Sequence, residues 1–323
     1  ALQVLEQRRQ RNKVSAILLL TDGQDGSTRP QLPALLALAR EESCAVYAFG
    51  FGSDHDAVLM AEVSEQAKTP FTYVEDTENL QDIFAGAVGG LTSVVAQDVE
   101  LTLTCQVPLK QLHTPFPVQR DADGQRATVR IPDIFAGETR DVLVELEVPA
   151  GGNAGPDTLF DSRLQYRDLH RGCVLQTPLV SMQATRVDEP QPEVEPDEEV
   201  SAQRERVEVM QALQAATAHG EGGDFQEAQS VLTAAEDRMS RKGKKTRMTD
   251  ALGAELADAK SRMASRSAWE SGGRAEVKDA VQMHQVQRCT NIAQSSRSRM
   301  KCSKAMYSSP ASSAWVAKSQ SKS

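Results

Sequence analysis

The sequence predicts an α/β fold for residues 1–94, followed by an antiparallel β-sandwich over 95–187 and a C-terminal helical region. Three observations support this division. An unbroken apolar run, Ile17 to Leu20, ends in an Asp-Gly pair, which is typical of a strand buried on both faces. From Val95 onward apolar and polar residues alternate with the two-residue period of a half-buried strand. Beyond residue 200 apolar residues recur at helical spacing.

Strands and helices alternate within the first 94 residues. Helical spacing marks 1–12, 31–42 and 80–91, and short apolar runs mark strands at 16–21, 46–51 and 71–74. This order predicts a doubly wound, Rossmann-like sheet with parallel strands and right-handed crossovers. We therefore expect Ile17–Leu20 and Val46–Phe51 to be adjacent parallel strands, with Asp22 at the carboxyl edge where such sheets bind ligands.

Four motifs occur in a fixed order: AILLLTDGQDGS from Ala16, AFGFGSDHD from Ala48, PFTYVED from Pro70 and LQDIFAGAVGGLTSVVAQ from Leu80. Together they resemble the second half of a von Willebrand factor type A domain of the intracellular eukaryotic kind. Such domains occur in plant-type ubiquitin ligases with a RING finger and in proteins that carry a von Willebrand interdomain. The resemblance implies that residues 1–94 are the C-terminal half of a truncated A domain and that 95–187 are the interdomain.

The resemblance also implies a Mg²⁺ site at the top of the sheet, completed by a carboxylate of the partner. The family takes its ligands from an Asp-x-Ser-x-Ser loop, a Thr before a middle helix, and an Asp that Asp22 matches. The sequence contains no Asp-x-Ser-x-Ser, and a single carboxylate does not hold Mg²⁺, which dehydrates reluctantly. We expect Asp22 to be a partial metal site and this chain to bind metal weakly or not at all. Alternatively, Asp22 is a turn residue ahead of Gly23.

The β-region shows no arrangement of catalytic type. His113 and His170 lack a neighbouring Ser or Cys with an orienting acid, so we interpret both as ordinary loop or surface residues. The five cysteines form no CxxC, and Cys44 and Cys105 lie in apolar strand contexts that favour buried thiols. Neither a zinc site nor a disulfide framework is predicted.

The C-terminal third begins with the run DEPQPEVEPDEE, residues 188–199, whose seven acids and three prolines predict a linker; a docking site for a basic partner is the alternative. Residues 200–287 predict a helical hairpin joined by HGEGGD. The run RMSRKGKKTR, 238–247, is interpreted as a basic interhelical loop rather than a nuclear-localisation or nucleic-acid segment. Residues 288–323 contain eleven serines and no acid, which predicts a disordered tail.

Composition limits the function classes. A net charge of −9 argues against a general nucleic-acid binder. No segment approaches the run of about 20 apolar residues that a membrane helix needs, and the sequence does not start with a signal peptide. We expect a cytoplasmic or nuclear protein that is not secreted and has neither membrane nor nucleic-acid partners.

Together these features predict a non-enzymatic protein–protein interaction module. Its intact form would use a divalent-metal-assisted site, contacting an acidic residue of the partner at the top face near Asp22. An alternative is the substrate-recruiting C-terminal portion of a RING-type ubiquitin ligase. A third interpretation, a self-processing protein of the hedgehog or intein type, needs a nucleophile at the start of a further β-rich domain, and the sequence offers no candidate. The oligomeric state is left open.

Overall fold

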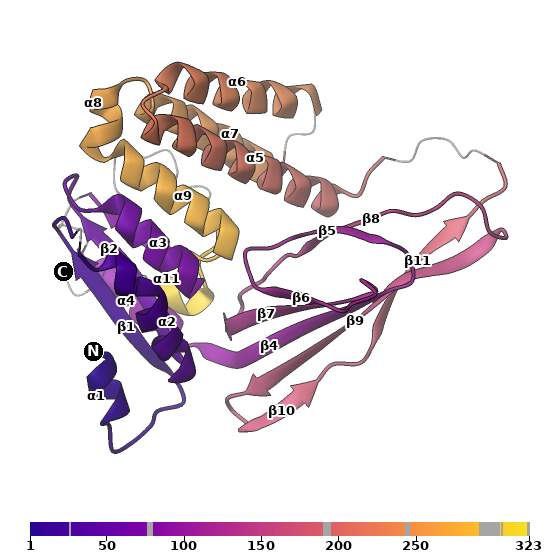
Figure 1. Ribbon diagram of the computed structural model, residues 1–323, viewed down its shortest axis with the longest axis horizontal. Coiled ribbons are helices and arrows are strands. Elements are labelled where there is room, and N and C mark those ends of the chain that lie inside the picture. Colours follow the sequence, from indigo (N-terminus) through magenta and orange to yellow (C-terminus); the bar gives the residue numbers. More distant parts are fainter. Residues whose placement is uncertain are drawn as a thin grey trace. The chain divides into compact units, whose positions relative to one another are not determined.

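The computed structural model describes residues 1–25, 27–75, 80–189, 195–242, 246–290, 304 and 306–321 (Figure 1). The chain divides into two compact units. Unit 1 comprises Ala1–Ser93, Ala136–Glu138 and Arg204–Ser323, and unit 2 comprises Val94–Phe135 and Thr139–Gln203. The C-terminal helices are therefore part of the same unit as the N-terminal sheet.

Unit 1 is built on a three-stranded parallel sheet in the order β1-β2-β3. The strands are β1 (Ser15–Thr21), β2 (Cys44–Phe51) and β3 (Phe71–Val74). In the register, Ile17 pairs with Val46 and Thr21 pairs with Gly50. The expected parallel neighbours are thus confirmed, and Asp22 directly follows β1 at the carboxyl edge.

Helices cover both faces of this sheet. The N-terminal elements are α1 (Leu2–Glu6), the 3₁₀ turn η1 (Arg29–Gln31), α2 (Leu32–Glu41), α3 (Ala57–Ala67) and α4 (Leu80–Leu91). Leu36 of α2 and Val63 of α3 pack with Val46 and Phe71 in one core. The Phe84 ring of α4 stacks on Phe49 of β2, with ring centroids 5.6 Å apart. Alternate residues of each strand therefore pack against helices on opposite faces of the sheet.

The helical region is larger than the expected hairpin. It comprises α5 (Glu198–Glu221), α6 (Phe225–Lys242), α7 (Arg247–Arg262), α8 (Arg266–Ala268), the π turn η3 (Trp269–Gly273) and α9 (Arg274–Val286). Leu213, Leu232 and Leu256, from α5, α6 and α7, meet in a core around Trp269. A two-helix hairpin would leave this apolar surface exposed, and α7 and α9 bury it. Ala275 of α9 also enters the core of the sheet.

The tail that was predicted to be disordered contains helix α11 (Pro310–Gln320), so for these residues the prediction is wrong. The Ser309 hydroxyl accepts a hydrogen bond from the Ser312 amide and caps the helix. Val316 is buried, and the Trp315 side chain lies where a Cβ on Gly89 of α4 would be. The glycine face of α4 lets α11 approach closely enough to order a serine-rich segment.

Unit 2 is an antiparallel β structure in two layers. Its strands are β4 (Val94–Cys105), β5 (Leu109–His113), β6 (Val118–Arg120), β7 (Arg126–Phe135), β8 (Leu143–Leu146), β9 (Gly155–Asp168), β10 (Cys173–Gln176) and β11 (Val180–Arg186). Six strands form one sheet, in which β10 and β11 both pair with β9, and β5 pairs with β8 in a second sheet of two strands.

The expected sandwich is present only in part, because its second layer has two strands. Leu109 and Leu146 of this small sheet pack with Leu103 and Ala127 of the large one. Strand β6 was not predicted from the sequence because all three of its residues are exposed and carry no burial pattern.

Two charged segments lie partly outside the described residues. Of the acidic run 188–199, residues 190–194 are not described, and Glu198 already begins α5. Of the basic run 238–247, residues 243–245 are not described, and α6 continues to Lys242. The basic run is therefore helical at its start rather than wholly a loop.

Candidate functional site

The loop after β1 is held by the Asp25 carboxylate. Oδ1 of Asp25 accepts hydrogen bonds from the Ser27 amide and the Ser27 hydroxyl, both at 2.8 Å, and Oδ2 accepts from the Thr28 hydroxyl. The Thr28 hydroxyl, followed by the Ser27 groups, lowers the pKa of Asp25 to about 2. Asp25 is therefore a structural anion that fixes the loop.

The loop after β2 lies beside it. The Asp56 amide donates to the Gly23 carbonyl oxygen at 3.1 Å, and the Asp56 carboxylate accepts from the Leu59 amide to cap α3. Arg29 pairs with Asp56 at 3.2 Å. These contacts join the two loops into one polar rim at the carboxyl edge of the sheet, as expected where parallel strands end together.

Below this rim, His55 packs against the sheet. Its Nδ1 donates to the Gly52 carbonyl oxygen at 2.7 Å, and its ring stacks on Tyr73 with centroids 5.6 Å apart. The ring occupies the space that a side chain at Gly50 would need, 2.2 Å from the Cβ position. Burial lowers the pKa of His55, which favours the neutral ring. His55 is therefore a packing residue of the edge.

Asp22 is exposed on the rim, in the place the sequence predicted. Across the described residues, no three His, Cys, Asp or Glu side chains gather into a group that could hold a metal ion. Magnesium favours several oxygen ligands in octahedral geometry, so the donors described around Asp22 do not fit a resident Mg²⁺. Weak or absent metal binding by this chain stays a prediction.

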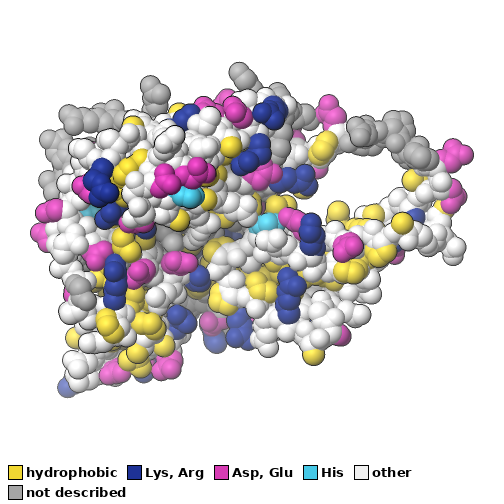
Figure 2. All heavy atoms as spheres, turned by 45° about the horizontal axis from the view of Figure 1, so that its top comes forward, with side chains coloured by type: hydrophobic (Ala, Val, Ile, Leu, Met, Phe, Trp, Pro, Cys, Tyr) yellow, Lys and Arg dark blue, Asp and Glu magenta, His cyan; other side chains and the backbone are white. Residues whose placement is uncertain are grey.

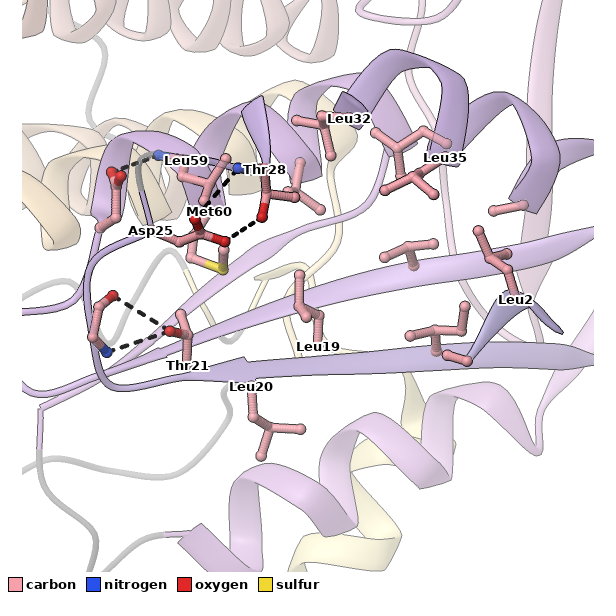
Figure 3. Close-up of a pocket in the computed structure, with 18 of the residues that line it drawn as sticks. Leu2, Leu19, Leu20, Thr21, Asp25, Thr28, Leu32, Leu35, Leu59 and Met60 are labelled. Carbon is pink, nitrogen blue, oxygen red and sulfur yellow. Dashed lines mark hydrogen bonds between the residues drawn. The ribbon is translucent and has the colours of Figure 1, made fainter. Parts of the chain in front are cut away.

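An apolar groove of about 540 Å³ runs along β1 from α1 to the rim (Figure 3). Leu19 points into it, facing Leu32 and Leu35 of α2, and Leu20 points to the opposite face of the sheet. The lining on the α3 side includes Leu59 and Met60, and Asp25 and Thr28 close the carboxyl end. The groove is a largely hydrophobic trough with a polar end.

The groove follows from the position of β1 in the sheet. β1 is an edge strand, paired only with β2 in the described sheet, so α2 has no further strand beneath it on that side. The four-residue apolar run of β1 predicts a strand buried on both faces, whereas Leu19 and Leu20 are 36% and 46% exposed in the structure. Sequence reasoning identified the strand and missed the groove.

The histidines and cysteines that the sequence analysis singled out lie away from this edge of the sheet. His170 is exposed, as expected for a surface residue. His113 is not a loop or surface residue, because it ends strand β5, its side chain is only 11% exposed, and its Nε2 lies 2.6 Å from the Glu145 carboxylate. Cys44 and Cys105 are buried, and burial raises the pKa of both thiols. No helix in the part of the chain that the structure describes is long and apolar enough to cross a membrane.

Comparisons with known proteins agree with this geometry. Residues 1–86 match the family model of the von Willebrand factor type A domain. A curated relative, "E3 ubiquitin-protein ligase WAV3" from Arabidopsis thaliana, is 33% identical over 159 residues, which are 46% of this chain and 20% of the relative. The chain thus spans about a fifth of the length of this relative.

Two solved structures resemble this chain to different degrees. A von Willebrand factor type A protein from Catenulispora acidiphila superimposes with a TM-score of 0.60 at 15% identity, over 77% of this chain and 59% of that one. The VWA2 paralog of ArnB from Sulfolobus acidocaldarius gives a TM-score of 0.42 at 16% identity, over 88% of this chain and 67% of that one. The first likeness extends past the residues that the family model matches. Residues 1–86 therefore match the von Willebrand factor type A domain family in sequence, and the chain shares the fold of a solved von Willebrand factor type A protein.

Proposed function

We propose that this chain is a protein-interaction module that holds a protein partner at the carboxyl edge of its parallel sheet. The observation that carries the proposal is the rim itself. Two loops are fixed to each other through Asp56 and Gly23, and Asp22 stands exposed beside them. Preorganised polar loops at a strand end are the usual site of recognition in open α/β folds.

The chemistry of the rim favours binding over catalysis. The carboxylates of Asp25 and Asp56 are engaged in capping and loop hydrogen bonds, and the nearby His55 is buried with its Nδ1 committed to a backbone carbonyl. No described nucleophile–base pair stands at this edge. A metal-assisted contact, as the family resemblance implies, would need ligands beyond Asp22, so the contact proposed for this chain is a direct one between the rim and a polar surface of the partner.

The decisive test compares two charge reversals of exposed aspartates. Asp22→Arg lies on the rim, and Asp237→Arg lies on the exposed side of α6 as the matched control. Quantitative affinity capture from plant extract should show a set of proteins lost with Asp22→Arg and kept with Asp237→Arg. Equal capture by both variants would refute a role for the rim.

A second candidate function rests on the plant relative. We propose, as the alternative, that the module recruits substrates to a ubiquitin ligase in the cytoplasm or nucleus, because the relative that shares 159 residues is an E3 ubiquitin-protein ligase. In a longer protein that carries both this sequence and a RING finger, Asp22→Arg should lower ubiquitin transfer to the captured partner and leave autoubiquitination unchanged. Unchanged transfer to the partner would leave recruitment without support.

A further inference from the structure

Helix α11 packs on α4 through a close approach that two glycines permit (Figure 1). A Cβ built on Gly89 of α4 would lie 2.9 Å from the Trp315 side chain, and one built on Gly86 would lie 3.6 Å from a Val316 methyl group. An isolated helix of about 11 residues is only marginally stable in water. The helical structure of α11 therefore depends on its contact with α4.

The last turn of α11 is bonded to a carboxylate of α4. The Ser319 hydroxyl donates to Asp82, which lies in the first turn of α4, and is also 2.8 Å from the Val316 carbonyl oxygen. The side-chain amide of Gln320 donates to the other carboxylate oxygen of Asp82 at 2.8 Å. One carboxylate thus accepts hydrogen bonds from two neighbouring residues of α11.

Helix α11 carries almost no charge of its own. Figure 2 shows charged side chains of both signs across the helical part of unit 1, at the upper left, whereas Lys318 is the only charged residue of α11. The Lys318 side chain is exposed, and its ammonium group lies 6.0 Å from the centroid of the Trp315 ring. A negative charge added to α11 beside Asp82 would therefore meet another negative charge rather than a cation of the same helix.

We propose that Ser319 is a phosphorylation site whose phosphate releases α11 from α4 by repulsion from Asp82. A protein kinase transfers the γ-phosphoryl group of ATP to the Ser319 Oγ atom. The new O–P bond forms, the bond between the γ-phosphorus and the β,γ-bridging oxygen breaks, ADP leaves, and the hydroxyl proton passes to the base of the kinase. The site uses neither Asp22 nor the rim, so it goes beyond the proposed function.

The phosphate reverses the contact at this end of the helix. Phosphoserine has no hydroxyl proton to donate to Asp82 and carries a charge of about −1.5 to −2 at neutral pH, which a neighbouring carboxylate repels. Ser319 is 9% exposed and lies in the last turn of α11. Helix ends open locally at little cost in free energy, and this opening gives a kinase access to the hydroxyl.

The first experiment asks whether the hydroxyl is modified. The full chain is incubated with Mg-ATP and a plant extract that contains phosphatase inhibitors, and its peptides are analysed by tandem mass spectrometry. Phosphate is expected on Ser319 of the parent chain and should be missing at this position in Ser319→Ala. A parent chain that is unmodified at Ser319, or modified only at other serines, overturns the proposal.

The second experiment measures docking with phosphoserine incorporated at one chosen position during translation. Amide hydrogen exchange throughout α11 should be at least tenfold faster with phosphoserine at position 319, and exchange in α6 should not change. Phosphoserine at position 313 is the matched control, because it adds the same charge to the first turn of the same helix, where the helix dipole favours an anion. This control should exchange like the unmodified chain.

Replacing Asp82 distinguishes charge repulsion from simple crowding. In Asp82→Asn the side chain keeps an acceptor for the Gln320 amide and carries no charge. Relative to unmodified Asp82→Asn, phosphoserine at position 319 should then raise the exchange rate of α11 less than threefold. Protection of α11 as in the unmodified parent, equal release by phosphoserine at position 313, or release that is as large in Asp82→Asn would each overturn the proposal.

Discussion

Replacing Glu276 by glutamine should abolish a loss of stability that unit 1 suffers as pH rises from about 4.5 to 7. Glu276 lies on α9, is 7% exposed, and has a carboxylate oxygen 2.5 Å from Nε of Arg262. Burial is the main cause that raises its pKa from 4.5 to about 7. The Arg262 charge opposes the shift, and the negative charges of Asp258 and Glu75 add to it.

The sign follows from comparing Glu276 in the folded and unfolded states. Below pH 4.5 the carboxyl is protonated in both states and does not change the free energy of unfolding. Between pH 4.5 and 7 the unfolded chain ionises first, so the free energy of unfolding falls, and above pH 7 it levels off. A pKa difference of about 2.5 corresponds to about 3 kcal/mol at most.

The assay is urea unfolding of the full chain at a series of pH values from 4 to 8, for the parent and for Glu276→Gln. The difference between the two curves isolates this carboxyl from the other titrating groups. Relative to the parent, the variant should gain up to about 3 kcal/mol on going from pH 4.5 to 7. Glu270→Gln, on an exposed glutamate that pairs with Arg266 at 3.5 Å, is the matched control and should follow the parent. Parallel curves for parent and Glu276→Gln would show that Arg262 keeps the buried carboxyl ionised and would refute the reasoning.

Three further predictions concern the sheet edge and the C-terminal helix. Gly50→Ala should destabilise unit 1 by about 1–3 kcal/mol in urea unfolding, because the new methyl group meets the His55 ring. The control Gly253→Ala has open space around it in α7 and should stabilise the protein by about 0.5–1 kcal/mol. Equal effects of the two substitutions would rule out the clash. Val316→Asp should raise amide hydrogen exchange throughout α11 and leave the rate in α6 unchanged, because Val316 is buried in the described fold; protection of α11 as in the parent would contradict its docking. Calorimetric titration with Mg²⁺ should give no dissociation constant below about 1 mM, because Mg²⁺ is reluctant to lose its water ligands for a single carboxylate. Saturable micromolar binding that is lost in Asp22→Ala would overturn this prediction.

The sheet of unit 1 could be predicted because its signals are local. The runs that became β1 and β2 are apolar on both faces, and the amphipathic segment between them fixes their parallel order. The position of Asp22 follows from the end of β1. The groove could not be predicted in the same way, because it depends on which side of β1 stays unpaired, and that is a property of the assembled sheet.

Helix α11 is a segment for which amino-acid composition predicts the wrong structure. Serine content predicted disorder, yet Ser309 followed by Pro310 is a helix-start signal present in the sequence. What orders the helix is a partner more than 200 residues away, since Gly86 and Gly89 of α4 leave room for Val316 and Trp315. Because the two segments are so far apart in the sequence, neither of them carries a periodic pattern that predicts this contact.

The C-terminal helices supply a surface on which the N-terminal sheet packs. Ala275 of α9 enters its core, and Arg288 donates to both carboxylate oxygens of Glu138 at 2.7 Å, next to the Tyr47 hydroxyl of β2. These contacts act on β2, β3 and the two helix layers, and they leave the outer edge of β1 as it is. Among the described strands, β1 and β3 remain the two edges of this sheet.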